Sequence, residues 1–106
     1  MWVDTDVTGV VEDSTFTGNV ADDGGGIAAR GDLTVLRSTF TGHTGDAGAG
    51  IFHDGSGALE VVQCRFDGNA AVSAGAGIGA DGTPSVVVRD SVFDGNTTVQ
   101  LSLIHI

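Results

Sequence analysis

The sequence predicts an all-β fold built as a parallel β-helix, a solenoid in which the chain winds in stacked coils. Three observations predict it: a phenylalanine every 24–27 residues, a valine five residues before each phenylalanine, and a glycine-isoleucine pair between successive phenylalanines. Eighteen glycines and the lack of an apolar stripe at a period of 3.6 residues argue against helices. A leucine-rich repeat has a similar period but needs several leucines per unit, which this chain lacks.

Residues that recur in fixed columns mark the repeat. The markers are the phenylalanines Phe16, Phe40, Phe66 and Phe93, the valines Val11, Val35, Val61 and Val88, and the isoleucines Ile27, Ile51 and Ile78. Apolar residues alternate with others before each phenylalanine, which indicates strands with one buried face. We expect the markers to form the core and Thr34, Glu60 and Val87 to face outward. Each coil should add a strand to each of three sheets, with coils ~4.8 Å apart.

The spacing divides this single domain into about three and a half coils of 24–27 residues. A ragged N-terminal edge at residues 1–9 is expected to precede coils at 10–32, 33–58, 59–85 and 86–98. Neither end carries the polar cap that a repeat array needs, so the chain is interpreted as an uncapped fragment. Residues 99–106 leave the pattern, and Leu101–Ile106 resembles a translated sequencing adapter, which makes this tail artefactual. The alternative is a native strand, because Ile104 follows Phe93 by 11 residues.

A polar column lies three residues after each phenylalanine and is preceded by glycine. Its members are Asn19, His43, Asn69 and Asn96. Stacked asparagine amides can bridge side chains and backbone groups from one coil to the next, which predicts a structural ladder. His43 has two ring nitrogens and can bridge in the same way. The preceding glycine suits a left-handed backbone position.

Two motifs together resemble a known repeat. They are Phe-x-x-Asn, at Phe16–Asn19, Phe66–Asn69 and Phe93–Asn96, and Gly-Gly-Ile at Gly25-Gly26-Ile27. It is similar to the right-handed β-helix repeats of polymorphic outer-membrane proteins and other secreted surface proteins, and pectate-lyase-like proteins share the general fold. The resemblance covers residues 9–98 and implies an extracellular or cell-surface location. His43 departs from the motif, as does Ala-Gly-Ala-Gly-Ile in the later copies.

Composition limits the partners of this chain. The net charge is −10, with four Arg and no Lys, which disfavours nucleic acid and anionic membrane surfaces as partners. No segment is long and apolar enough for direct membrane insertion, and residues 1–9 do not form a signal peptide. Cys64 occupies a column of small residues with Ser14, Ser38 and Ser91, so we expect a buried thiol that replaces a serine.

Three acidic residues form the candidate metal site. Asp22 and Asp46 hold the same position in adjacent coils, and Asp23 lies beside them. Carboxylates that stack ~4.8 Å apart repel one another and must splay apart or share a cation. Calcium prefers oxygen ligands in flexible acidic loops and is the one cofactor that this cluster suggests. The alternative is an ordinary solvated aspartate turn.

The columns predict a structural or adhesive segment and offer no catalytic residues. The expected partners are carbohydrate or a host or cell-surface protein, together with further coils of the same chain. Phe52 follows an inward isoleucine and should therefore face outward, where an aromatic ring can stack on a sugar. The alternative is a fragment of a polysaccharide lyase or glycoside hydrolase whose active site lies in missing coils. Two cross-coil ion pairs are also expected, Asp13–Arg37 and Arg30–Asp54.

Overall fold

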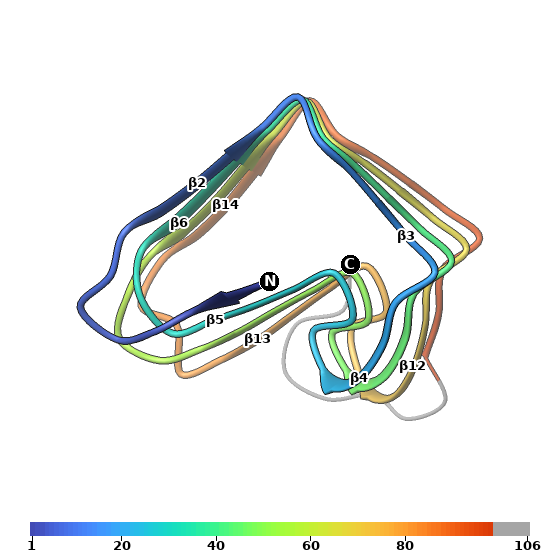
Figure 1. Cartoon of the computed structure of the whole chain (residues 1–106), viewed down its shortest axis with the longest axis horizontal. Helices are drawn as coiled ribbons and strands as arrows, with labels where there is room; N and C mark the ends of the chain where they lie inside the picture. The colour runs from blue at the N-terminus through green and yellow to red at the C-terminus, as the bar shows by residue number, and fades with distance from the viewer. Residues whose placement is uncertain (99–106) are drawn as a thin grey trace.

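The computed structural model describes residues 1–98, which wind as an all-β solenoid with every paired strand parallel to its neighbours (Figure 1). Four sheets, and not the three expected, surround one interior in this part of the chain. Each round of the solenoid runs through sheets A, B, C and D in that order. The tail at 99–106, interpreted above as artefactual, lies outside the described residues.

Each sheet contains one strand from each round. Sheet A is formed by β1 (Trp2–Val3), β5 (Ile27–Ala29), β9 (Ile51–Asp54) and β13 (Ile78–Asp81). Sheet B is formed by β2 (Gly9–Glu12), β6 (Leu33–Leu36), β10 (Leu59–Val62) and β14 (Val86–Arg89). Sheet C is formed by β3 (Thr15–Thr17), β7 (Thr39–Thr41), β11 (Arg65–Asp67) and β15 (Val92–Asp94). Sheet D is formed by β4 (Val20–Asp23), β8 (Thr44–Ala47), β12 (Ala70–Ala74) and β16 (Thr97–Thr98).

The fourth sheet arises from a corner inside the segment that leads to each phenylalanine. The residue three before the phenylalanine has a left-handed backbone in every round: Asp13 (φ 51°), Arg37 (φ 48°), Gln63 (φ 55°) and Asp90 (φ 53°). This conformation breaks the strand and turns the chain from sheet B into sheet C, as Figure 1 shows at the top of the view. Aspartate tolerates the left-handed region, but arginine and glutamine seldom adopt it. The corner could therefore not be predicted from the residue types in this column.

Glycine forms the next corner, between sheets C and D. The glycine two residues after each phenylalanine has a positive φ in all four rounds: Gly18 (63°), Gly42 (67°), Gly68 (60°) and Gly95 (66°). The left-handed position expected for this column is confirmed. Because a side chain is strained in this region, glycine is the residue that lets the chain turn without steric strain.

Stacked side chains fill the interior. Successive phenylalanine rings are stacked and nearly parallel, with centroids 4.9, 4.8 and 4.7 Å apart and interplanar angles of 1°, 5° and 1°. Val35, Val61 and the three column isoleucines are fully buried, and Val88 packs partly buried against them. The expected core is therefore confirmed. The stacking distance matches the spacing of the coils, ~4.8 Å.

The solenoid also includes residues that were expected to form an edge. Strand β1 pairs with β5, so that Trp2 aligns with Ala28 and Val3 with Ala29. Val3 is buried in the core. The sheet pattern therefore begins at residue 2. Within residues 1–98 no helix is long and apolar enough to cross a membrane.

Candidate functional site

The polar column forms a continuous ladder between coils. The N–H of Asn19 donates to His43 Nδ1 (3.1 Å), the N–H of His43 to Asn69 Oδ1 (3.0 Å), and the N–H of Asn69 to Asn96 Oδ1 (3.0 Å). The side chains also donate to the phenylalanine carbonyls of the preceding coil: Asn69 Nδ2 to Phe40 (3.1 Å) and Asn96 Nδ2 to Phe66 (2.9 Å). Each rung thus satisfies backbone groups at the corner between sheets C and D.

His43 makes the same two contacts as an asparagine would. Its Nδ1 accepts from Asn19, and its Nε2 lies 3.0 Å from the carbonyl oxygen of Phe16, which can only accept. These partners require the neutral tautomer with the proton on Nε2. His43 is fully buried, and this burial lowers the pKa of its imidazole, while the hydrogen bond to Phe16 offsets part of the shift. The ladder is therefore a structural element that is built for a neutral histidine.

His53 is a second buried histidine whose role the sequence reasoning missed. Its Nε2 donates to the carbonyl of Gly31 (2.8 Å), and its Nδ1 lies 2.8 Å from the hydroxyl of Thr83. Gly31, His53 and Thr83 belong to three successive rounds, so one side chain ties three coils together. The alternation of side chains along a strand could have revealed it. Ile51 faces inward, so His53, two residues later, faces inward as well.

The column of small residues forms another set of contacts between coils. The N–H of Ser14 donates to Ser38 Oγ (3.2 Å), and the N–H of Cys64 donates to Ser91 Oγ (3.1 Å). Cys64 is buried and its Sγ lies 3.3 Å from the Val62 carbonyl oxygen, in the role that hydroxyls play in the other rounds. Burial raises the pKa of the Cys64 thiol. The thiol is buried as expected and replaces a serine.

The three acidic residues of the calcium hypothesis do not form a described metal group. Asp22 and Asp46 are exposed on β4 and β8, next to the aligned pair Asp23 and Ala47. Among the residues whose side chains the structure describes, no three His, Cys, Asp or Glu side chains are placed to hold a metal ion together. The side chain of Asp23 is not among those described. Calcium binding at this cluster stays a prediction.

A shallow aromatic hollow lies on the outer face of sheet A. It is lined by Trp2, Ala29, Arg30, Phe52 and Asp54 and has a volume of about 60 Å³. Trp2, Ala28 and Phe52 are aligned in register across β1, β5 and β9, so the small Ala28 separates the two rings. Trp2 is 57% exposed, and the guanidinium of Arg30 stands 5.6 Å from its ring centroid. Arg30 therefore packs on Trp2. The expected ion pair between Arg30 and Asp54 does not occur in the part of the chain that the structure describes.

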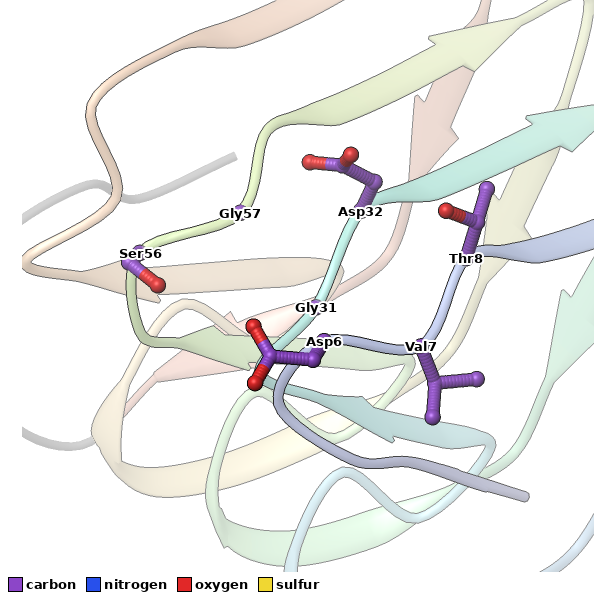
Figure 2. Close-up of a pocket in the computed structure, with 7 residues that line it drawn as sticks. All are labelled: Asp6, Val7, Thr8, Gly31, Asp32, Ser56 and Gly57. Carbon is purple, nitrogen blue, oxygen red and sulfur yellow. The ribbon is translucent and has the colours of Figure 1, made fainter.

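A larger turn hollow of about 250 Å³ follows where sheet A leads into sheet B. It is lined by Asp6, Val7, Thr8, Gly31, Asp32, Ser56 and Gly57. Figure 2 shows these residues on three neighbouring turns, with the carboxylate of Asp6 directed away from the side chain of Val7. The middle turn is the shortest, because Leu33 follows Ile27 by six residues whereas Leu59 follows Ile51 by eight. The hollow is thus a notch left by a short turn between longer ones.

Arginine side chains hold carboxylates on the surface. Arg37 Nε donates to Asp13 Oδ1 (2.7 Å), and Arg37 Nη2 donates to Glu12 Oε2 (3.2 Å). The expected pair Asp13–Arg37 is therefore confirmed. The hydrogen bond from Arg37 holds the pKa of the Asp13 carboxyl below its usual value. A lowered pKa keeps the Asp13 carboxyl ionised, which is the opposite of what a general acid requires.

Comparison with known proteins places this geometry in a family. No curated protein and no solved structure matches the chain. One family does match, described as the right-handed β-helix region, and its pattern covers residues 1–105. Four parallel sheets around a stacked interior agree with that description. The chain therefore belongs to the right-handed β-helix family.

Proposed function

We propose that this chain is a structural and adhesive repeat segment of a secreted or cell-surface protein, and not a catalyst. One observation carries the proposal: inward columns keep small or apolar residues from coil to coil, whereas outward columns vary in polarity and charge. In sheet B one inward column is valine in every round and the other reads Gly9, Leu33, Leu59 and Val86, while the outward column between them reads Val10, Thr34, Glu60 and Val87. A repeat whose interior is fixed and whose surface varies is suited to presenting contacts along a rigid body.

The proposed location outside the cell rests on the repeat motif, and composition narrows the partners. A net charge of −10 with no lysine keeps the chain soluble and disfavours nucleic acid as a partner. The partners that fit an outward surface of this kind are carbohydrate or a protein of a cell surface, and further coils of the same chain would extend the stack. The secreted relatives that the repeat motif resembles point the same way.

The surface carboxylates favour this role over catalysis. Glycoside hydrolysis needs two carboxyl groups at a defined gap, one of them protonated at neutral pH by its surroundings. Asp13, Asp67 and Asp94 instead lie against arginine, at 2.7, 2.5 and 3.8 Å from the nearest guanidinium nitrogens. For Asp13, the hydrogen bond from Arg37 holds the pKa below its usual value and so stabilises the ionised form, which suits a surface and not an acid catalyst.

Two measurements test the proposal. Antibodies raised against the purified chain should label intact cells of the source organism, and mild protease treatment of those cells should remove the signal. Label that appears only after the cells are permeabilised would overturn the extracellular location. The purified chain should also release no reducing ends and no unsaturated products from a panel of polysaccharides. Steady product release would instead favour the alternative, a fragment of a polysaccharide lyase or glycoside hydrolase.

A further inference from the structure

We propose that the aromatic hollow on sheet A is a binding site for a neutral glycan built of hexose units. This inference rests on the proposed function, because it names the ligand that an adhesive surface would bind. It assigns the ligand contacts to Trp2 and Phe52, which supply the rings, and to Arg30 and Asp54, which supply the polar groups.

The two rings form a platform with a gap between them. Trp2 and Phe52 occupy the same column of sheet A, two coils apart, which corresponds to about 10 Å between backbones. Ala28 between them has no side chain beyond a methyl group and is only 7% exposed. Trp2 is 57% exposed and Phe52 is partly exposed, so both rings give the apolar face of a sugar ring a surface to pack on. The hollow of about 60 Å³ has room for a hydroxymethyl group or the edge of a ring.

The edge of the platform carries both a hydrogen-bond donor and a hydrogen-bond acceptor, and a sugar hydroxyl can bond to either. Arg30 offers only donors and Asp54 offers only acceptors. Neighbouring hydroxyls of a hexose can accept from the guanidinium and donate to the carboxylate at the same time. Arg30 is already oriented by its contact with the Trp2 ring, at 5.6 Å from the centroid, so less side-chain freedom is lost on binding.

Charge selects a neutral sugar over an acidic one. Asp54 lines the hollow itself, and Asp81 is aligned with it on β13. The net charge of the chain is −10, so a polyanion such as a polyuronate would approach against the field of the whole molecule. Arg30 is the single cation among the residues that line either described hollow. A neutral glycan gains the stacking and the hydrogen bonds without this repulsion.

The turn hollow can receive the next sugar unit. Arg30 leads directly into Gly31 and Asp32, which line it, and Asp54 is two residues from Ser56. The turn hollow is lined by the carboxylates of Asp6 and Asp32 and the hydroxyls of Thr8 and Ser56 (Figure 2). These groups are acceptors and donors for hydroxyls, and they carry no positive charge. The two hollows therefore offer consecutive contacts to an oligosaccharide rather than to a single sugar.

Trp2 provides the signal for the test. It is the only tryptophan in a chain that has no tyrosine, so its fluorescence reports on this site alone. The purified chain is titrated with cellohexaose and mannohexaose as neutral probes and with a galacturonate oligomer as the acidic probe. At least one neutral probe should change the fluorescence in a saturable way. The galacturonate oligomer should bind more weakly than that probe at low ionic strength.

Variants link the signal to the site. Phe52→Ala should raise the Kd of the neutral probe about three- to tenfold, the loss expected for one aromatic contact. Asp54→Asn should raise it while leaving the melting curve unchanged. Val87→Ala, on the outer face of sheet B, is the matched control and should leave the Kd unchanged. Titration calorimetry of the wild-type chain gives the affinity if the fluorescence change is small.

Three results would overturn the inference. These are the absence of any saturable neutral binding by both fluorescence and calorimetry, tighter binding of the acidic oligomer, and an equal loss of affinity in Val87→Ala and Phe52→Ala. None of them alters the outcome of the cell-surface labelling, so failure of the glycan site and failure of the proposed function remain distinguishable.

Discussion

His43 accepts a hydrogen bond at Nδ1 from the backbone N–H of Asn19 in the preceding coil, at 3.1 Å. The other ring nitrogen faces the carbonyl of Phe16 at 3.0 Å. A proton on Nδ1 would face the Asn19 N–H donor and break the rung. The neutral ring is therefore part of the folded structure, and its protonation must be linked to unfolding.

Acid should destabilise the chain through His43. Burial lowers the pKa of His43 in the folded state, so the unfolded chain takes up a proton first as the pH falls. The contribution of the neutral ring is complete above pH of about 6.5, the value for a free histidine. Below that, it is lost at up to about 1.4 kcal/mol per pH unit until the folded pKa is reached. Urea unfolding at a series of pH values from about 5 to about 8 measures this loss of stability.

His43→Asn supplies the control for this pH dependence. An asparagine can accept from Asn19 and donate to Phe16, as Asn69 does toward His43 and Phe40 in the next coil. We expect the variant to fold and to lose the slope that the wild type shows near pH 6.5. An unchanged slope would mean that other groups, such as surface carboxylates, cause the acid sensitivity.

Phe40→Ala should strongly destabilise the fold. Phe40 is fully buried between the rings of Phe16 and Phe66. Removing such a ring costs about 3–5 kcal/mol because it leaves a cavity that a rigid stack cannot close. Phe40→Asp should abolish cooperative unfolding altogether, since it adds a buried charge. Asp46→Ala on the exposed side of β8 is the comparison and should preserve the transition. A transition unchanged in Phe40→Asp would contradict the inward column.

Gly26→Ala should destabilise the chain through a backbone clash. An added Cβ would lie 2.5 Å from the carbonyl oxygen of Gly50 and 2.8 Å from Cδ2 of Phe40. The carbonyl cannot move without disturbing the next coil, so we expect a cost of about 1–3 kcal/mol. Gly42→Ala tests a different cause, because it meets no atom within 4 Å but has a φ of 67°. Thermal unfolding of both variants should separate the clash from the backbone strain.

Gln63→Gly should stabilise the chain. Gln63 holds a left-handed backbone (φ 55°), which costs a residue with a side chain about 1–2 kcal/mol. Glycine removes that strain, although its greater freedom in the unfolded chain returns part of the gain. The net increase in unfolding free energy should be up to about 1 kcal/mol by guanidinium titration. Thr34→Gly in the middle of β6 should have the opposite sign, and equal effects would contradict the corner.

Cys64 should react slowly with thiol reagents in the folded chain. It is 3% exposed, and burial raises the pKa of the thiol, so little reactive thiolate is present near neutral pH. Unfolding in urea should expose it and speed its reaction with a disulfide reagent to that of a free thiol. Rapid modification without denaturant, at a rate close to that of the unfolded chain, would show that this column opens locally.

The repeating columns made the interior predictable from sequence. The spacing between Val35 and Phe40 is the same in every round, which identified the residues of the core. The Asn-His column follows a glycine in every round, which identified the ladder. The corner at Arg37 was not predictable, since arginine has no intrinsic preference for the left-handed backbone that the stack imposes on it. The number of sheets was missed for this reason.

The candidate site was harder to predict than the core. Trp2 precedes the first recognisable copy, so only the pairing of β1 with β5 brings it into line with Phe52. The inward position of His53 follows from alternation, but its partners lie in turns of different length, which sequence spacing does not align. Contacts between positions that do not repeat are set by tertiary stacking, whereas columns that recur in every coil, the Asn-His ladder included, can be placed from the local pattern.

The alignment of equivalent positions has a consequence for how such a chain can evolve. Phe66 meets Phe40 on one side and Phe93 on the other, in the same geometry. A duplicated unit inserted between two coils would find the same neighbours above and below as its parent did. Unequal recombination can therefore lengthen or shorten the molecule in steps of one unit, each ~4.8 Å in height, without redesigning the interior. Molecular length then becomes a heritable trait that varies independently of the residues displayed on each face.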